Sequence, residues 1–252
     1  MDLGLKGKKA IVTGGTRGIG RAIADTFARE GCEVGICARN EDEVKQAVAS
    51  LEALGAKATG SMVDVADGEA LRSWIESAEK TIGGIDILVP NVSAMDVGAG
   101  PESWKRGFEL DILGTVNAVE AALPFLKKSG VGAIVVVGST AAVQVDGPQA
   151  YSGVKAALVP YIKGLAVQLA PDNIRANLVS PGTIYFDGGV WQKIQKHAAE
   201  MYNTALSRNP MGRMGTPQEV ANAVVFLSSP AASFISGTNM ICDGALTRRV
   251  QF

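Results

Sequence analysis

The feature that most constrains the fold of this chain is a regular alternation of short β-rich runs with amphipathic helical patterns. The predicted strands are KKAIVTG, EVGICAR, ATGSMVD, IDILV, GAIVVVGS, IRANLVS and TNMICDG. Helical spacing of apolar residues predicts helices at residues 19–30, 41–54, 69–81, about 103–127, 150–169, around Trp191, and 217–227. Continuous apolar strands indicate a sheet that is covered on both faces. The pattern therefore predicts an α/β fold, a doubly wound parallel sheet of about seven strands, as one domain over residues 1–252.

The composition of the 252-residue chain narrows the class of partner. The formal net charge is −1 and there is no basic tract, so we expect neither nucleic acid nor an anionic membrane surface as a partner. No run approaches the roughly 18 apolar residues of a membrane helix, and the N-terminus lacks an apolar stretch of signal-peptide length. The three cysteines lack metal or redox spacing. We therefore expect a soluble, cytoplasmic protein with a small-molecule partner.

His197 is the only histidine of the sequence, which removes whole classes of mechanism. A multi-histidine metal site is impossible, and Ser-His-Asp hydrolysis would have to use this residue. His197 lies in VWQKIQKHAAEMYNTAL, where apolar residues recur at helical spacing. We therefore expect it to border an apolar stripe, and we expect no metal site.

A glycine-rich segment, TGGTRGIG at residues 13–20, follows the first predicted strand and opens the first predicted helix. Ligands of doubly wound sheets bind beyond the carboxyl ends of the strands. Glycines let the backbone approach a pyrophosphate, and the N-terminus of a helix supplies free N–H donors and the positive end of a dipole. The placement of the glycines between strand and helix therefore predicts a dinucleotide site.

Tyr151 and Lys155 lie four positions apart in AYSGVKAAL, so both side chains are expected on one face of a helix. One alternative is a chance surface pair. Another is the S-x-x-K pattern of serine acyl enzymes, which Ser152 and Lys155 also satisfy. The S-D-N and K-T-G motifs of those enzymes are missing, and their mechanism gives the glycine-rich turn no role. The surrounding motifs therefore decide between these interpretations.

Several motifs, in order along nearly the whole chain, resemble those of the short-chain dehydrogenase/reductase family. They are T-G-x-x-x-G-x-G at residues 13–20, Ser139 in VVGST, Y-x-x-x-K at Tyr151 and Lys155, SPG at residues 180–182, and DGA near the end. The resemblance implies a Rossmann domain that binds NAD(P) and an oxidoreductase that interconverts a ketone and a secondary alcohol. It also implies a homotetramer.

The resemblance implies catalytic roles for Ser139, Tyr151 and Lys155. A free phenol, with a pKa near about 10, is a poor catalyst at neutral pH, but a nearby cation favours the phenolate. Tyr151 would donate a proton to the substrate carbonyl while Ser139 hydrogen-bonds to the same oxygen, and Lys155 would also bind the nicotinamide ribose. Asp111 aligns with the family's fourth catalytic position, an asparagine. Its carboxylate would stabilise the ammonium of Lys155 or serve only as a structural anchor.

NADP(H) is the expected cofactor, in preference to NAD(H). Folds that bind NAD usually carry an acid about 20 residues beyond the glycines, whereas this chain has Ala38 and Arg39 there, with Arg17 inside the turn. Two guanidinium groups suit a ribose 2′-phosphate, although both could instead be solvated surface charges. Asp64 resembles the family's adenine contact, but could equally cap a helix. The expected cofactor-binding residues are Gly14, Thr16, Arg17, Gly18, Ile19, Gly20, Arg39, Asp64, Val65, Asn91, Tyr151, Lys155, Pro181, Gly182 and Ile184.

The sequence departs from the family after the fourth predicted strand, where Pro90-Asn91-Val92-Ser93 replaces N-N-A-G. Pro90 has no N–H and is expected at the end of the strand. A positive φ at Ser93 would be strained. Asn91 is therefore the only residue carried over from this motif.

The region of about 185–210 occupies the position where the family builds a substrate lid. The expected substrate contacts are Ser139, Val143, Tyr151, Tyr185, Phe186 and Trp191, which with Met95 predict a largely apolar pocket for a medium-sized ketone or alcohol. A 3-oxoacyl-[acyl-carrier-protein] reductase is an alternative. Lys127 and Lys128 could dock an acidic carrier, but Asp172 and Asn173 stand where Arg-Gly is expected. A non-catalytic NADP-binding scaffold is a further alternative, against which the presence of Tyr151 and Lys155 argues.

Overall fold

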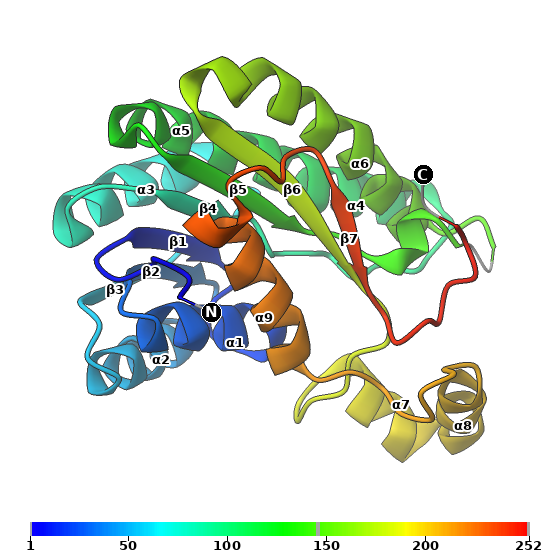
Figure 1. Ribbon diagram of the computed structural model, residues 1–252. Coiled ribbons are helices and arrows are strands. Elements are labelled where there is room, and N and C mark those ends of the chain that lie inside the picture. Colours follow the sequence, from blue (N-terminus) through cyan, green and yellow to red (C-terminus); the bar gives the residue numbers. More distant parts are fainter. Residues whose placement is uncertain (1, 145–146, 251–252) are drawn as a thin grey trace.

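Seven strands form one parallel sheet in the order β3-β2-β1-β4-β5-β6-β7, so the predicted doubly wound sheet is confirmed (Figure 1). The computed structural model describes residues 2–144 and 147–250. The strands are β1 (Lys9–Thr13), β2 (Glu33–Ala38), β3 (Ala58–Met62), β4 (Ile87–Val89), β5 (Gly132–Val137), β6 (Ile174–Pro181) and β7 (Asn239–Cys242). β1 pairs with both β2 and β4, so the strand order reverses between β1 and β4. Ligand sites of such sheets lie beyond the carboxyl ends of the strands at this switch point.

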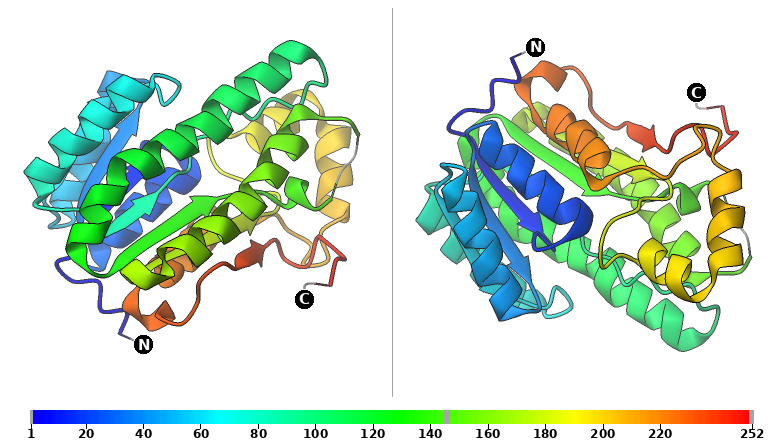
Figure 2. Two further views of the ribbon diagram at one scale, coloured as in Figure 1. Left: turned by 90° about the horizontal axis from the view of Figure 1, so that it is seen from above. Right: turned by 90° about the horizontal axis from the view of Figure 1, so that it is seen from below.

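Helices cover both faces of the sheet, as the views in Figures 1 and 2 show. One face carries α1 (Gly18–Arg29), α2 (Glu41–Ala53) and α9 (Pro217–Ser228), and the other carries α3 (Gly68–Ile82), α5 (Gly114–Ser129) and α6 (Ala150–Leu169). Alternate residues of a strand point to opposite faces of a sheet. Ala10 and Val12 of β1 accordingly pack in the core with α1, α2 and α9, whereas Ile11 packs in the core on the opposite face. This burial on both faces explains why the strands are continuous apolar runs.

Two predicted helices are interrupted in the structure. The stretch at about 103–127 consists of α4 (Pro101–Gly107), a π-helical turn (Phe108–Leu113) and α5. The stretch around Trp191 breaks at Ala198, whose backbone has φ −148° and ψ 59°, into α7 (Val190–His197) and α8 (Ala199–Ser207). Apolar residues continue at helical spacing through both interruptions, so the sequence pattern did not reveal them.

The remaining elements are short. The 3₁₀ turns are Thr140–Ala142, Ala170–Asp172 and Pro230–Ala232. β4 is shorter than its predicted run, and Pro90 follows it as expected, with its carbonyl accepting a hydrogen bond from the Val137 N–H (3.0 Å). Pro160 lies inside α6, which continues to Leu169.

α7 and α8 lie in the region expected to form a lid, and this region is called the lid below. The two helices lie apart from the sheet, beyond the end of β6 (Figure 1). Neither helix contains a fully buried residue, and His197 is exposed. Within residues 2–144 and 147–250, no helix is both long and apolar enough to cross a membrane.

Candidate active site

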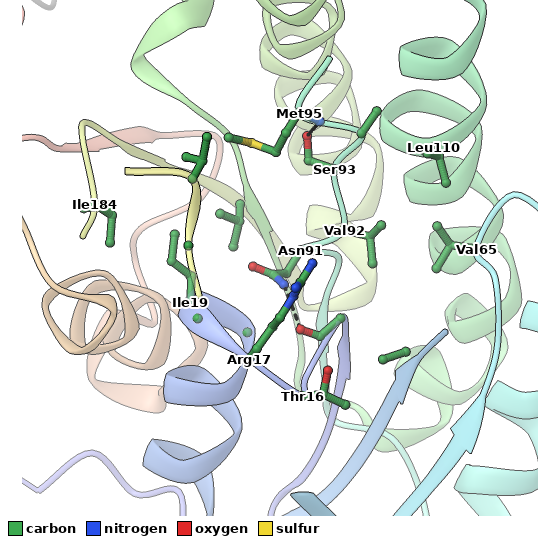
Figure 3. A pocket seen from close by; sticks show the side chains of 18 of the residues that line it. Thr16, Arg17, Ile19, Val65, Asn91, Val92, Ser93, Met95, Leu110 and Ile184 are labelled. Carbon is green, nitrogen blue, oxygen red and sulfur yellow. Dashed lines mark hydrogen bonds between the residues drawn. The ribbon is translucent and has the colours of Figure 1, made fainter. Parts of the chain in front are cut away.

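A cavity of about 690 Å³ opens at the carboxyl ends of the strands, beside the switch point (Figure 3). It is lined by the glycine-rich turn, the loop after β4, the segment after β5, the start of α6 and the segment that joins β6 to the lid. All residues expected to bind the cofactor line it: Gly14, Thr16, Arg17, Gly18, Ile19, Gly20, Arg39, Asp64, Val65, Asn91, Tyr151, Lys155, Pro181, Gly182 and Ile184. Segments far apart in the sequence therefore meet at the predicted edge of the sheet.

The glycine-rich turn has a backbone that side chains would disrupt. Gly14 and Gly18 have positive φ angles of 68° and 56°, and a Cβ on Gly20 would overlap the carbonyl oxygen of Gly14. Asn91 holds the turn from the neighbouring loop, because its side-chain amide donates to the carbonyls of Thr13 (3.1 Å) and Gly14 (3.3 Å). A bare backbone at the N-terminus of α1 fits the pyrophosphate of a dinucleotide.

The end of the cavity beside the glycine-rich turn and β2 carries charges of both signs. Arg17 extends from the turn into the cavity (Figure 3), and Arg39 lines it at the end of β2. Glu43 of α2 also lines this end, and its carboxylate accepts a hydrogen bond from the Thr16 hydroxyl (3.0 Å). Sequence patterns did not single out Glu43, because an acid in the first turn of a helix is common without any ligand.

Asp64 and Cys37 also line this end of the cavity. Asp64 accepts a hydrogen bond from the Ala66 N–H (3.1 Å), as the side chain of a local turn does. Burial raises the pKa of the Cys37 thiol to about 12, so this cysteine is a neutral thiol and not a thiolate.

Ser139, Tyr151 and Lys155 line the same cavity. Tyr151 and Lys155 lie on α6, with the ammonium nitrogen of Lys155 5.9 Å from the centre of the Tyr151 ring. Ser139 follows β5, and its hydroxyl oxygen accepts a hydrogen bond from the Ala141 N–H (3.1 Å). Ser152, the nucleophile of the S-x-x-K alternative, is buried and does not line the cavity. The geometry therefore favours Tyr151 over Ser152 as the reacting side chain.

Lys155 is almost completely buried, with 2% of its side chain exposed, and lies beside Asp111, which is 0% exposed. Its ammonium donates to the Val137 carbonyl (3.2 Å) and lies 3.0 Å from Oδ1 of Asp111. This last contact is an ion pair and not an aligned hydrogen bond, and Oδ1 has no other polar partner in the described part of the chain. Oδ2 of Asp111 accepts a hydrogen bond from the Ala94 N–H (2.9 Å).

The expected substrate contacts are only partly brought together. Phe186 and Trp191 line the cavity, and the ring of Phe186 rests against Gly18 of the glycine-rich turn. Val143 does not line the cavity. Tyr185 does not line it either, because its side chain packs within the lid, where its hydroxyl donates to Gln195 (2.7 Å). The direction of these side chains could not be read from the sequence.

Met95, which was expected in the pocket, lines the substrate end of the cavity, and several residues that were not predicted line it too. Ser93 and Met95 line the cavity along the loop after β4 (Figure 3), as do Leu110 and Arg106. Positive φ falls at Met95 (52°) and not at Ser93, so Ser93 is unstrained. Lys193 reaches the cavity from α7. Their presence adds polar and charged groups to the predicted apolar pocket.

The described part of the chain holds no cluster of three or more His, Cys, Asp or Glu side chains that could bind a metal ion.

Comparison with known proteins gives matches over almost the whole chain. The family profile described as "Enoyl-(Acyl carrier protein) reductase" matches residues 14–247. Isoepoxydon dehydrogenase patN of Penicillium expansum is 39% identical over 257 residues, which cover 100% of this chain and 99% of that protein.

Solved structures give the same result with different cofactors. L-Sorbose reductase from Gluconobacter frateurii, solved with NADPH and L-sorbose, has a TM-score of 0.91 at 33% identity and covers 99% of this chain and 100% of its own. A 7α-hydroxysteroid dehydrogenase, solved with NADH and 7-oxo glycochenodeoxycholic acid, has a TM-score of 0.88 at 32% identity and covers 99% and 98%. Together with the motifs and the parallel sheet, these matches show that the chain belongs to the short-chain dehydrogenase/reductase family of oxidoreductases.

Proposed function

We propose that the protein is an NADP(H)-dependent oxidoreductase that interconverts a ketone and a secondary alcohol. The observation that carries the proposal is the meeting of Tyr151, Lys155 and Ser139 with the glycine-rich turn in one cavity. The first three are the groups for acid–base chemistry at a carbonyl oxygen, and the turn fits a dinucleotide beside them.

In this function the nicotinamide supplies the hydride for reduction, or accepts it during oxidation. Tyr151 donates the proton to the carbonyl oxygen in reduction and takes it back in oxidation. The ammonium of Lys155 lies 5.9 Å from the centre of the phenol ring, where its charge can act on the proton transfer. Ser139 hydrogen-bonds to the same substrate oxygen and orients it.

The preference for NADP(H) rests on Arg17 and Arg39, which both line the cavity. A guanidinium group recognises a phosphate through two parallel hydrogen bonds, so a 2′-phosphate gains contacts that a 2′-hydroxyl does not. Glu43 opposes this preference by its charge, so the preference depends on two cations against one anion. We expect catalytic efficiency with NADPH to exceed that with NADH by at least about 10-fold.

The proposed substrate is a free carbonyl compound or alcohol of medium size, bound between Tyr151, Phe186 and Trp191. The alternative, a carrier-protein-bound 3-oxoacyl group, needs free cations on the surface. Lys127 instead lies beside Asp172 (2.9 Å), whose negative charge opposes the approach of an acidic carrier to this surface. This pair favours a free small molecule.

Replacement of Tyr151 by Phe tests the proposed function. Tyr151→Phe should retain NADPH binding, measured by fluorescence titration, and lose at least about 100-fold in reduction across a panel of ketones, because the proton donor is removed. A variant that still reduces a ketone at the wild-type rate contradicts the proposal. A wild-type protein that binds NADPH but converts no panel member supports the non-catalytic scaffold instead.

We also propose a homotetramer in the cytoplasm. Trp104, Phe108 and Leu113 are exposed apolar residues on α4 and the π-helical turn, which suits a helix face covered by another copy. The three cysteines are free thiols, as in a reducing compartment. Light scattering coupled to gel filtration tests the assembly.

A further inference from the structure

Asp111 is a buried carboxylate placed between two donors from different parts of the molecule. Oδ1 faces the ammonium of Lys155 on α6 at 3.0 Å, and Oδ2 accepts the N–H of Ala94, in the loop after β4, at 2.9 Å. Both side chains of the ion pair are shielded from water, with exposed fractions of 0% and 2%. Charges in such surroundings are screened little, so the pair interacts strongly.

The chemistry of this position calls for a carboxylate. An asparagine side chain has one acceptor oxygen and one NH₂ donor, whereas an ionised aspartate has two acceptors. An amide at position 111 would direct its NH₂ group at either the Lys155 ammonium or the Ala94 N–H. One of the two contacts would be lost, and a buried donor left without a partner is costly.

The π-helical turn fixes this carboxylate in place. Thr115 donates its hydroxyl to the backbone carbonyl of Asp111 (2.7 Å) and so anchors the turn to α5. Phe108 and Leu113, at the two ends of the turn, are exposed, whereas Asp111 between them is fully buried. π-Helical turns are frequent at functional sites.

The loop held by Asp111 forms the substrate end of the cavity. Ala94 directly precedes Met95, whose φ of 52° is unfavourable for a side-chain-bearing residue and must be maintained by its surroundings. Ser93 and Met95 line the cavity (Figure 3), and the Met95 N–H donates to the Ser93 hydroxyl (3.2 Å). The contact from Asp111 to Ala94 is therefore next to the strained residue.

We propose that Asp111 is a positioning residue that joins the lysine to the substrate loop, holding Lys155 as a buried ion pair and the loop at residues 93–95 in its strained conformation. Asp111 does not line the cavity and acts through these two neighbours. The chemical part of this inference rests on the proposed function. The structural part, the hold on Lys155 and on the loop, does not.

The charges around Lys155 give the inference a measurable consequence. The groups that face its ammonium are Asp111 from the π-helical turn, Tyr151 from α6 and the Val137 carbonyl from β5. Arg106 of α4 lines the same cavity and forms an ion pair with Asp96 at 3.6 Å. Removing the Asp111 charge leaves the ammonium without its buried counter-ion and so changes the charge that lies beside the Tyr151 ring.

The first test compares Asp111→Asn with Glu109→Gln in the full-length chain. Glu109 lies in the same π-helical turn and loses the same charge in the control, but it does not line the cavity. In Asp111→Asn the single amide oxygen of the new side chain should face the charged Lys155 donor, which turns the NH₂ group towards the Ala94 N–H and removes that contact. Hydrogen–deuterium exchange should therefore become about 10-fold faster in the peptide at residues 91–97 of Asp111→Asn and stay unchanged in Glu109→Gln. Wild-type exchange in Asp111→Asn overturns the proposal.

The second test is the pH profile of alcohol oxidation with NADP. The profile should change in Asp111→Asn, because a buried charge beside Lys155 is lost, and stay in place in Glu109→Gln. A profile for Asp111→Asn that superimposes on the wild type overturns the proposal. If the wild type oxidises no alcohol, the proposed function fails, whereas the exchange experiment still judges the role of Asp111.

The third test uses thermal unfolding and keeps the inference falsifiable if Asp111→Asn does not fold. Lys155→Met leaves the carboxylate of Asp111 buried without its counter-ion. Asp111→Asn leaves the ammonium of Lys155 buried without its counter-ion. The double variant should therefore unfold at a higher temperature than Lys155→Met alone. A double variant that unfolds at or below the temperature of Lys155→Met, or that does not fold, overturns the proposal.

Discussion

The glycine-rich turn and the lid line the same cavity but are held in different ways. In the turn, a Cβ on Gly20 would overlap the backbone, and Asn91 holds two carbonyls from the next loop. α1, which follows the turn, is packed by buried residues such as Ile23 and Phe27. The lid helices α7 and α8 have no buried residue. The glycine-rich turn is therefore fixed by the backbone and the core, and the lid by surface contacts.

The base of the lid, where the chain enters and leaves it, is nevertheless held by backbone hydrogen bonds. The Tyr185 N–H donates to the Gly215 carbonyl (2.9 Å) and the Gly215 N–H to the Thr183 carbonyl (2.9 Å), which joins the two ends of the lid. Segments with few buried contacts open locally at low free energy, whereas core helices open only with the whole domain. The difference teaches that the lid can change its contacts and its sequence while the cofactor end keeps one geometry.

The strongest test of this contrast is Gly20→Ala. The added Cβ overlaps the Gly14 carbonyl and meets the Asn91 amide, both parts of the backbone-fixed turn, so the turn must deform. We expect NADPH binding, measured by calorimetry, to weaken by about 100-fold or more.

The matched control is Gly164→Ala, on an exposed part of α6 where an added Cβ meets nothing within 4 Å. Alanine in a helix should stabilise the protein by about 0.5–1 kcal/mol and leave binding unchanged. Wild-type affinity in Gly20→Ala would remove the contrast between the two ends of the cavity.

The part of the molecule fixed by its backbone is also the part that the sequence predicted well. Strands and amphipathic helices that pack on a core produce a periodic pattern of apolar residues in the sequence. The period is two residues in a strand and three to four residues in a helix. All seven strands and most helix bounds were predicted on that ground. The glycine-rich turn is visible for the same reason, since only glycine fits its conformation at Gly14 and Gly18.

The substrate end was predicted less well, for physical reasons. Periodicity does not show where a helix breaks when the apolar pattern continues, as at Ala198, or where it gains a residue, as in the π-helical turn. It also does not give the direction of a surface side chain. Tyr185 turned into the lid, whereas Arg106 turned towards the cavity.

A smaller effect is expected at the contact between the two regions, the ring of Phe186 against Gly18. Phe186→Ala removes this apolar contact and frees the lid from the turn. We expect NADPH affinity to fall by about 10-fold, equal to about 1.4 kcal/mol, and lid exchange to rise. Tyr185→Phe is the control, because it removes only the hydroxyl bonded to Gln195 and should leave affinity within about 2-fold. Equal affinities in Phe186→Ala and wild type would show that the lid does not rest on the turn.

The smallest effect is expected at the base of the lid, where Glu219 caps α9. Its carboxylate accepts from the Thr216 N–H (2.8 Å) and pairs with both terminal nitrogens of Arg213, at 2.9 and 2.6 Å. Hydrogen bonding from Arg213, and then from Thr216, lowers the pKa of Glu219 to about 2. Because this folded-state pKa lies below the unfolded value of 4.5, the stabilisation is complete above about pH 5 and is lost as the pH falls towards 2.

Glu219→Gln should therefore lower the free energy of unfolding by about 1 kcal/mol at pH 7, the size of a typical helix cap, and by much less near pH 2.5. Urea unfolding at the two pH values measures this difference. Glu200→Gln, in the first turn of α8, is the control and should change stability by no more than a few tenths of a kcal/mol at either pH. A Glu219→Gln deficit that is the same at pH 7 and pH 2.5 would mean that the carboxylate charge does not hold the lid base. The firm joint at Gly215 would then depend on its backbone hydrogen bonds alone, and the lid would resemble the glycine-rich turn more than the contrast allows.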